Sequence, residues 1–289
     1  MNKKILFPLL SALCSAIVLL FSEILTTKYI LSPISLIFLT NIFGGICIFL
    51  FLPNKQKNIK NIFTTHPILM ICASIFSYFL SGFAAFYASS QIGSTKISFA
   101  LQLETLFVVL FAIMFLKEKI TKRHIFAGIL IIGGGVLLQV HQTGITFTFA
   151  DFIALLAPLF FSIGIILNTR LLQYHNATTI TAIGQLTVAI LLCMLIPWLN
   201  FPLTLTSLSL IILMSSLEGI SWLCYNKGLK AAGASVTTIL FGTLPFFTLI
   251  FSYISNQWYE NFFIIPQNIL FIIIGGILIF GGITIESFE

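Results

Sequence analysis

Ten apolar segments, separated by short gaps, take up most of this chain. The hydrocarbon layer of a membrane is about 30 Å thick, so a helix that crosses it needs roughly 20 apolar residues. Of the 289 residues, 58% are apolar and only 8% are Asp, Glu, Lys or Arg, too few to cover a soluble globule of this length. We therefore predict an all-α integral membrane protein. Its ten predicted transmembrane helices cover residues 5–25, 31–52, 67–90, 96–116, 124–140, 151–169, 177–198, 206–226, 233–254 and 267–284.

Basic residues gather in alternate gaps between these segments. If the N-terminus lies in the cytoplasm, twelve of the fourteen Lys and Arg residues are cytoplasmic, and only Lys28 and Lys96 lie outside. Short cytoplasmic loops carry such an excess of positive charge. The first segment follows Lys3 and Lys4 as a signal peptide would, but it is too long for one and no small-residue cleavage site follows it. We predict a multi-pass protein of the inner (cytoplasmic) membrane with both termini in the cytoplasm.

Two short motifs recur in the second half of the chain. Gly-Ile-Leu-Ile-Ile-Gly-Gly at 128–134 returns as Gly-Ile-Leu-Ile-Phe-Gly-Gly at 276–282, and Gly-Ser-Thr at 93–95 has a counterpart in Gly-Ala-Ser at 233–235. These matches predict two five-helix repeats. Because five is odd, the second repeat enters the membrane from the opposite side, an inverted topology that many secondary transporters share. The glycine pairs of helices 5 and 10 are expected to mark close packing. The predicted repeats are residues 1–140 and 141–289.

The fourth segment of each half carries a family resemblance. Leu103-Glu104-Thr105, followed by Phe115-Leu116-Lys117-Glu118, and Pro245 in the second half resemble the EamA group of the drug/metabolite transporter superfamily. That group usually shows Leu-Glu-Pro and Gly-Glu, where this chain has Thr105 and Lys117. The resemblance implies a secondary transporter or facilitator, expected to act as an exporter of a small metabolite. It also implies that helices 1, 3, 4, 6, 8 and 9 surround the transport site.

Three carboxylates fall within or close to the predicted membrane segments. An ionisable side chain in the bilayer interior is costly and usually marks a substrate path or a proton relay. Glu104 and Glu218 lie in the middle of helices 4 and 8, whereas Glu23 lies near the end of helix 1, within reach of the interface. All three are candidates for proton coupling. The alternative for Glu104 and Glu218 is a protonated carboxyl group that is hydrogen-bonded to a neighbouring helix, and the alternative for Glu23 is a side chain that reaches the outer interface.

Aromatic residues accompany one of these carboxylates. Trp222 and Tyr225 follow Glu218 at i+4 and i+7, so the three share one helix face and are predicted to bind a cationic or amine-bearing solute. The alternative is an interfacial aromatic belt. The remaining candidates for substrate binding are Tyr78, Glu104, Gln102 and Lys96.

Two of these candidates have an ordinary alternative. Lys96 lies slightly over two helical turns before Glu104, and it is expected either to bind a substrate carboxylate or to lie at the outer interface. Gln102 is expected either to line the pathway or to bond a neighbouring helix. The predicted solute is an amino acid, an amine or another cationic or zwitterionic metabolite.

Several other functions are disfavoured by the motifs. The chain has no GxxxxGK[ST] loop for nucleotide-driven transport, no H-E-x-x-H motif and no C-x-x-C pair. Its basic residues do not form one face, so no nucleic-acid partner is expected. We predict no catalytic residues, cofactor or metal, and partners limited to a small-molecule substrate and membrane lipid. A membrane-embedded enzyme, a lipid flippase and an open channel remain alternatives, and both a monomer and a homodimer are compatible with the sequence.

Overall fold

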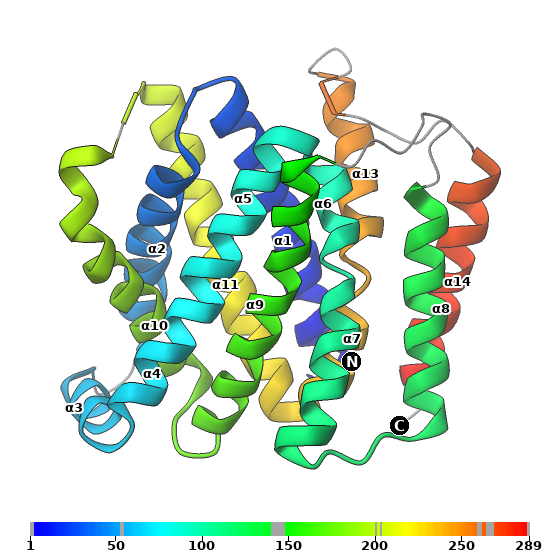
Figure 1. The fold of residues 1–289 in the computed structure, drawn as a ribbon, viewed down its shortest axis with the longest axis horizontal. Coiled ribbons are helices and arrows are strands. Elements are labelled where there is room, and N and C mark those ends of the chain that lie inside the picture. Colours follow the sequence, from blue (N-terminus) through cyan, green and yellow to red (C-terminus); the bar gives the residue numbers. More distant parts are fainter. Residues whose placement is uncertain are drawn as a thin grey trace.

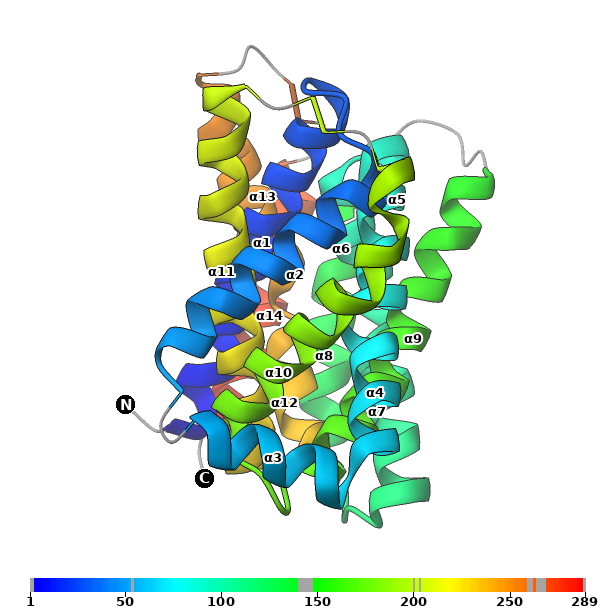
Figure 2. The same cartoon turned by 90° about the vertical axis from the view of Figure 1, so that its left-hand side faces the viewer.

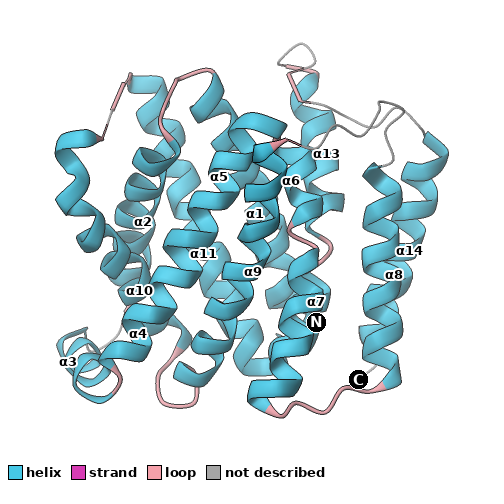
Figure 3. Ribbon diagram, in the orientation of Figure 1, coloured by secondary structure: helices cyan, strands magenta, loops and turns pink. Residues whose placement is uncertain are grey.

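Every regular element that the structure describes is a helix (Figures 1 and 3). The computed structural model describes residues 3–52, 55–139, 148–199, 201–202, 204–258, 262–263 and 269–287. The predicted end of the fifth helix and boundary between the repeats, at residues 140 and 141, and the predicted start of the tenth helix at 267 lie outside these ranges. Within them the all-α prediction is confirmed.

The first half contributes five membrane crossings. Three of them are single helices, and the third and fourth crossings are built from several shorter helical pieces in succession. In the third crossing the pieces run on without a break, through a π-helical stretch, η1. The elements are α1 (Lys3–Thr27), α2 (Pro33–Leu50), α4 (Pro67–Ser74) with η1 (Ile75–Leu80) and α5 (Ser81–Ile92), α6 (Ser94–Ala100) with α7 (Leu103–Phe111) and the π-helical η2 (Ala112–Leu116), and α8 (Lys122–Gln139).

The second half repeats this arrangement. Polar N-caps set where its helices begin: the Thr148 hydroxyl accepts a bond from the backbone N–H of Asp151, and Thr204 does the same for Ser207. The fourth crossing of this half, which is the ninth of the chain, is again divided into two helical pieces. The elements are α9 (Phe149–Leu171), α10 (Ala177–Leu192) with the 3-10 turn η3 (Cys193–Trp198), α11 (Leu205–Ala232), α12 (Ala234–Phe241) with α13 (Leu244–Asn256), and α14 (Ile269–Ser287).

The ten crossings form an inverted repeat. Eight of the helical stretches are long and apolar enough to span a bilayer, and α8 and α14, with 18 and 19 residues, complete the set. Since each half crosses five times, α9 enters from the face opposite to the one that α1 enters. The two described chain ends lie near the same face (Figures 1 and 2), which we call the terminal face. The other is the opposite face.

A short helix on the terminal face was not predicted. The gap between the second and third crossings holds α3 (Lys55–Thr65), an amphipathic helix with three lysines. Its Ile62 side chain is fully buried, whereas Lys60 is exposed. The segment is too short and too polar to span the membrane, so no long apolar run marks it in the sequence.

The first helix of each half packs against the other half. Helix α1 makes its most extensive contacts with α11, and it also packs on α12 and α13. Helix α9 packs against α4, η1, α5 and α7. Small polar residues allow the close approach of α1 and α11, where Ser15 Oγ lies 2.7 Å from Ser221 Oγ. We call α1, α11, α12 and α13 the α1 bundle, and α9 with α4, η1, α5, α6, α7 and η2 the α9 bundle.

The repeated glycine motifs pack against each other. Helices α8 and α14 form a pair at one side of the molecule (Figure 1). A Cβ atom added to Gly134 would lie 2.6 Å from the backbone oxygen of Gly275, and one added to Gly282 would lie 2.8 Å from that of Ala127. Each motif therefore supplies the small residue that its partner helix needs, and the expected role of these glycines in close packing is confirmed.

Candidate functional site

The fourth crossing of each half is interrupted near its middle, and the two interruptions touch. Helix α6 ends before Leu101 and Gln102, and α12 ends before Gly242 and Thr243. The Gln102 Nε2 atom donates a hydrogen bond of 2.9 Å to the backbone oxygen of Gly242. Gln102 and Gly242 are equivalent in the repeat, so the broken helices cross at corresponding points. Broken helices at the centre of inverted repeats surround the substrate site in many transporters.

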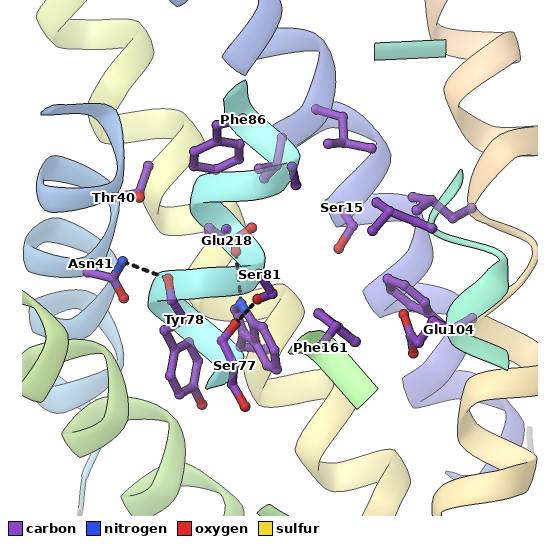
Figure 4. A pocket seen from close by; sticks show the side chains of 18 residues that line it. Ser15, Thr40, Asn41, Ser77, Tyr78, Ser81, Phe86, Glu104, Phe161 and Glu218 are labelled. Atoms are coloured by element: carbon purple, nitrogen blue, oxygen red, sulfur yellow. Dashed lines mark hydrogen bonds between the residues drawn. The ribbon is translucent and has the colours of Figure 1, made fainter. Parts of the chain in front are cut away.

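A cavity of about 60 Å³ lies next to this crossing, between the α1 bundle and the α9 bundle (Figure 4). Ligand sites for drug-sized molecules usually enclose roughly 300–1,000 Å³, so in this conformation only a small solute fits. The lining comes from crossings 1, 2, 3, 4, 6, 8 and 9. It consists of Ser15, Val18, Leu19, Thr40, Asn41, Ser77, Tyr78, Ser81, Gly82, Ala85, Phe86, Leu101, Glu104, Phe161, Glu218, Trp222, Phe241 and Leu244.

Glu218 reaches the cavity from α11. One turn further along this helix, Trp222 Nε1 donates a hydrogen bond of 2.8 Å to Glu218 Oε1. The Trp222 ring lies against Tyr78, with centroids 4.5 Å apart. Three of the predicted substrate-binding residues, Glu218, Trp222 and Tyr78, therefore lie together in the lining, whereas Tyr225, predicted on the same face as Glu218, is not among the lining residues. The indole thus orients the carboxylate through one of its two oxygens.

Glu104 lies across the cavity from Glu218, in the first turn of α7 (Figure 4). Its Oε1 atom accepts two hydrogen bonds from the α1 bundle, one of 2.6 Å from the Tyr225 hydroxyl and one of 2.7 Å from Thr238 Oγ1. The side chain is 1% exposed, and its Oε2 atom has no hydrogen-bond partner among the described residues. Glu104 thus connects the two bundles through its Oε1 atom, and its Oε2 atom is available to accept a further hydrogen bond.

A layer of aromatic rings packs beside the cavity, toward the terminal face. Trp222 and Tyr225 follow Glu218 along α11, about 6 and 10 Å nearer to that face at 1.5 Å per residue. The Phe161 ring packs against both of them and against Phe241, with centroid distances of 4.9 Å to Trp222, 5.5 Å to Tyr225 and 6.0 Å to Phe241, and Tyr225 contacts Phe241 directly at 5.1 Å. Rings at these spacings pack favourably on one another, so they form an apolar layer on the side of the cavity that faces the terminal face.

The other predicted site residues lie outside the cavity lining. Lys96 is half exposed and forms an ion pair of 2.5 Å with Asp151 at the opposite face. Gln102 bonds the neighbouring broken helix, as described above. Tyr225 belongs to the aromatic layer and is buried. Glu23 is buried near the opposite face, where its Oε2 atom accepts a bond of 2.7 Å from the backbone N–H of Ser94.

Sequence reasoning missed several lining residues. Asn41 is the most polar of them: its Nδ2 atom donates to the backbone oxygen of Ile37 at 2.9 Å, and its Oδ1 atom has no partner among the described residues. Phe161, Ser15 and Ser77 also line the cavity. A Ser, Asn or Phe in an apolar segment is common, so only the resemblance, through helices 1, 3 and 6, pointed toward three of these positions.

A separate polar cluster lies at the terminal face. His66 Nδ1 lies 3.3 Å from His175 Nε2, and the His66 ring stacks on Tyr174 with centroids 4.5 Å apart. Burial lowers the pKa of His175 below its usual value, and the neighbouring His66 lowers it further. Within the described ranges, no group of three or more His, Cys, Asp or Glu side chains has the arrangement of a metal site.

The fold and the cavity together define a multi-pass membrane protein of the inverted-repeat transporter class. The model of the EamA-like transporter family matches residues 2–140 and again residues 148–285. The chain therefore belongs to the EamA-like transporter family, and the resemblance to the drug/metabolite transporter superfamily is confirmed. Proteins of this family are membrane transporters, so the coarse function is transport.

Several solved structures have the same fold, and one of them is a crystal structure. It shares 17% identical residues with this chain and superposes with a TM-score of 0.69, covering 96% of each chain. No curated protein matches the sequence.

Proposed function

We propose that the chain is a gradient-driven transporter of a small organic amine, which it moves through the cavity by alternating access. The observation that carries the proposal is the composition of the lining. Two carboxylates, Glu104 and Glu218, line the cavity, and among the described residues around it there is no Lys, Arg or His. Such a lining favours a positively charged solute.

The unused acceptors support the same class of substrate. Asn41 Oδ1 and Glu104 Oε2 are buried and have no donor among the residues that the structure describes, and an unpartnered buried acceptor costs about 1–3 kcal/mol. An ammonium group has only donors to offer, so it can bind such atoms while the rings of Tyr78 and Trp222 present their negative faces to its charge. Lys96 is engaged by Asp151, which leaves a substrate carboxylate without a cationic partner in the lining. The lining thus favours an amine over the amino acid of the same shape.

Orientation and energy source belong to the same proposal. All the described lysines and arginines except Lys28 and Lys96 lie at the terminal face, which supports a cytoplasmic location for that face and for both termini. Glu104 and Glu218 lie near the middle of their crossings, where a proton gradient is a suitable driving force. We propose that one of these carboxylates releases a proton when the amine binds.

Uptake by proteoliposomes tests the substrate class. Tyramine and tyrosine differ only by a carboxyl group, and we expect saturable uptake of tyramine with little uptake of tyrosine. Glu218→Gln should reduce tyramine uptake at least about tenfold, because a charge-assisted hydrogen bond is worth about 1.5–3 kcal/mol and a tenfold change is about 1.4 kcal/mol. Lys96→Gln is the matched control and should keep wild-type uptake. Preference for tyrosine, or full uptake by Glu218→Gln, would refute the proposal.

A pH gradient tests the coupling. An imposed gradient should change the initial rate of amine uptake in wild-type proteoliposomes. If Glu104 or Glu218 carries the coupled proton, then Glu104→Gln or Glu218→Gln should abolish this response. A response that survives in both variants would exclude these residues as the proton carriers.

A further inference from the structure

Two glycine turns begin the broken helices of the two repeats. Gly93 precedes α6 at the opposite face and Gly233 precedes α12 at the terminal face, and each has a φ of 85°. Glycine adopts this conformation without the steric cost that a side chain would add. The turns are equivalent in the repeat and face opposite sides of the membrane, because the repeat is inverted. In both, the first backbone N–H groups of the following helix have no partner within that helix.

A glutamate binds each of these turns. At the opposite face the backbone N–H of Ser94 donates to Glu23 Oε2 at 2.7 Å. At the terminal face, Glu118 accepts bonds of 2.8 Å from the N–H of Ala234, 3.1 Å from the N–H of Ser235 and 2.6 Å from the Ser235 hydroxyl. The positive end of a helix dipole and the free N–H groups both favour a carboxylate at this position.

Both contacts join the same two bundles. Glu23 belongs to α1, in the α1 bundle, and Ser94 begins α6, in the α9 bundle. Glu118 follows η2, in the α9 bundle, and it binds the start of α12, in the α1 bundle. The cavity lies between these bundles. One carboxylate therefore connects the two bundles on the opposite-face side of the cavity, and another connects them on the terminal-face side.

We propose that Glu23 and Glu118 are the two gating residues of the transport cycle. The cavity opens to the opposite face when Glu23 leaves the turn at Gly93, and it opens to the terminal face when Glu118 leaves the turn at Gly233. Both contacts are formed in the structure, so neither carboxylate has left its turn in this conformation. This inference rests on the alternating access proposed above and adds to it the residues that hold each side shut.

The ion pair between Lys96 and Asp151 supplies a control. It also lies at the opposite face, but it connects α6 to α9 and so stays inside the α9 bundle. Breaking it removes a charged contact of that face without releasing one bundle from the other. A neutral bond from Ser22 to Ser89 crosses between the bundles close to Glu23 and will limit the effect of losing that carboxylate.

Spin-label distances in nanodiscs test the proposal without any substrate. The five native cysteines are free and can be replaced before labels are attached. One label pair reports on the opposite face, at Phe149 of α9 and Leu205 of α11, and a second reports on the terminal face, at Gln173 after α9 and Lys230 of α11. All four positions are exposed, and each pair joins the two bundles.

The two variants should act on different pairs. Glu23→Gln should add a longer distance between Phe149 and Leu205 and leave the other pair unchanged, whereas Glu118→Gln should lengthen only the distance between Gln173 and Lys230. In the corresponding alanine variants a larger fraction of the molecules should show the longer distance, because alanine also removes the side-chain oxygen that accepts the hydrogen bond. The unaffected pair in each variant shows that the protein is still folded, and Lys96→Gln should change neither distance.

Unchanged distances in both alanine variants, or the same pair lengthened in both, would overturn the gating roles. The outcome does not depend on which solute is carried. If the distances shift as expected while amines are not transported, the gating proposal stands and the proposed substrate class is wrong.

Discussion

Two adjacent glycines of α8 should respond in opposite ways to the same substitution. Nothing lies within 4 Å of a Cβ atom built on Gly133. On Gly134 the same atom would lie 2.6 Å from Gly275 O, 2.9 Å from Ile279 Cγ1 and 3.1 Å from Ile279 N. Two of these neighbours are backbone atoms of α14, so a Gly134→Ala variant has to move the two helices apart.

The size of the difference follows from these contacts. Ala replaces Gly within a helix with a gain of roughly 0.5–1 kcal/mol, so Gly133→Ala should raise the free energy of unfolding by about that amount. Overpacking a close interface costs about 1–3 kcal/mol, so Gly134→Ala should lower it by about 0.5–2 kcal/mol after the same gain is included. The two variants should therefore differ by about 1–3 kcal/mol.

Unfolding of the purified protein in detergent, by heat and by titration with SDS, measures this difference. The other repeat supplies an independent pair: a Cβ atom on Gly281 would lie 3.9 Å from Leu130 Cδ1, whereas one on Gly282 would lie 2.8 Å from Ala127 O. Gly282→Ala should therefore be less stable than Gly281→Ala. Equal stabilities within either pair would refute the packing of α8 on α14 described above.

Three further variants should change stability in defined directions. Lys117 is exposed and has a φ of 56°, so Lys117→Gly should raise the free energy of unfolding by about 1 kcal/mol, measured by thermal unfolding; a less stable variant would show that the lysine side chain contributes more than the strain costs. Tyr225→Phe removes a donor to Glu104 and should cost about 1–3 kcal/mol in the same assay, whereas an unchanged stability would mean that this hydrogen bond contributes nothing. Because folding lowers the pKa of His175 below its usual 6.5, the unfolded chain binds its proton more tightly, and stability should fall as the pH drops below about 6.5. His175→Gln should flatten that dependence in melting curves between pH 5.5 and 7.5, and an unaltered slope would contradict the assignment to His175.

Most of the fold could be predicted because a membrane imposes one length on every crossing. The predicted segment 5–25 corresponds to α1, Lys3–Thr27, and 151–169 corresponds to α9, Phe149–Leu171. A helix predicted from hydropathy ends at its last apolar residue. The observed helices end at capping residues in the polar interface, such as Thr148. Interruptions within a crossing, such as that at Leu101 and Gln102, leave no trace in hydropathy.

Pairings between distant residues were the part that the sequence could not supply. Lys96 and Glu104 were expected in one continuous helix, slightly over two turns apart, but the interruption between α6 and α7 lies between them, and Lys96 pairs with Asp151 of another helix. Glu118 belonged to the segment that carries the family resemblance, but no role was predicted for it, and the structure places the first N–H groups of α12 beside it. The recurrence of Gly93 at Gly233 was the one available signal, and it marked the turns without indicating which carboxylates bind them.

The exchange of α1 and α9 between the halves affects how the protein is made. Helix α1 leaves the ribosome first, but its main partner α11 begins at Leu205. At about 5–20 residues per second, α1 waits roughly 10–40 s for that partner. During this interval the hydroxyl groups of Ser11 and Ser15 lack Ser221, which they later contact. The first half of the chain therefore completes its own packing only when the second half has been synthesised.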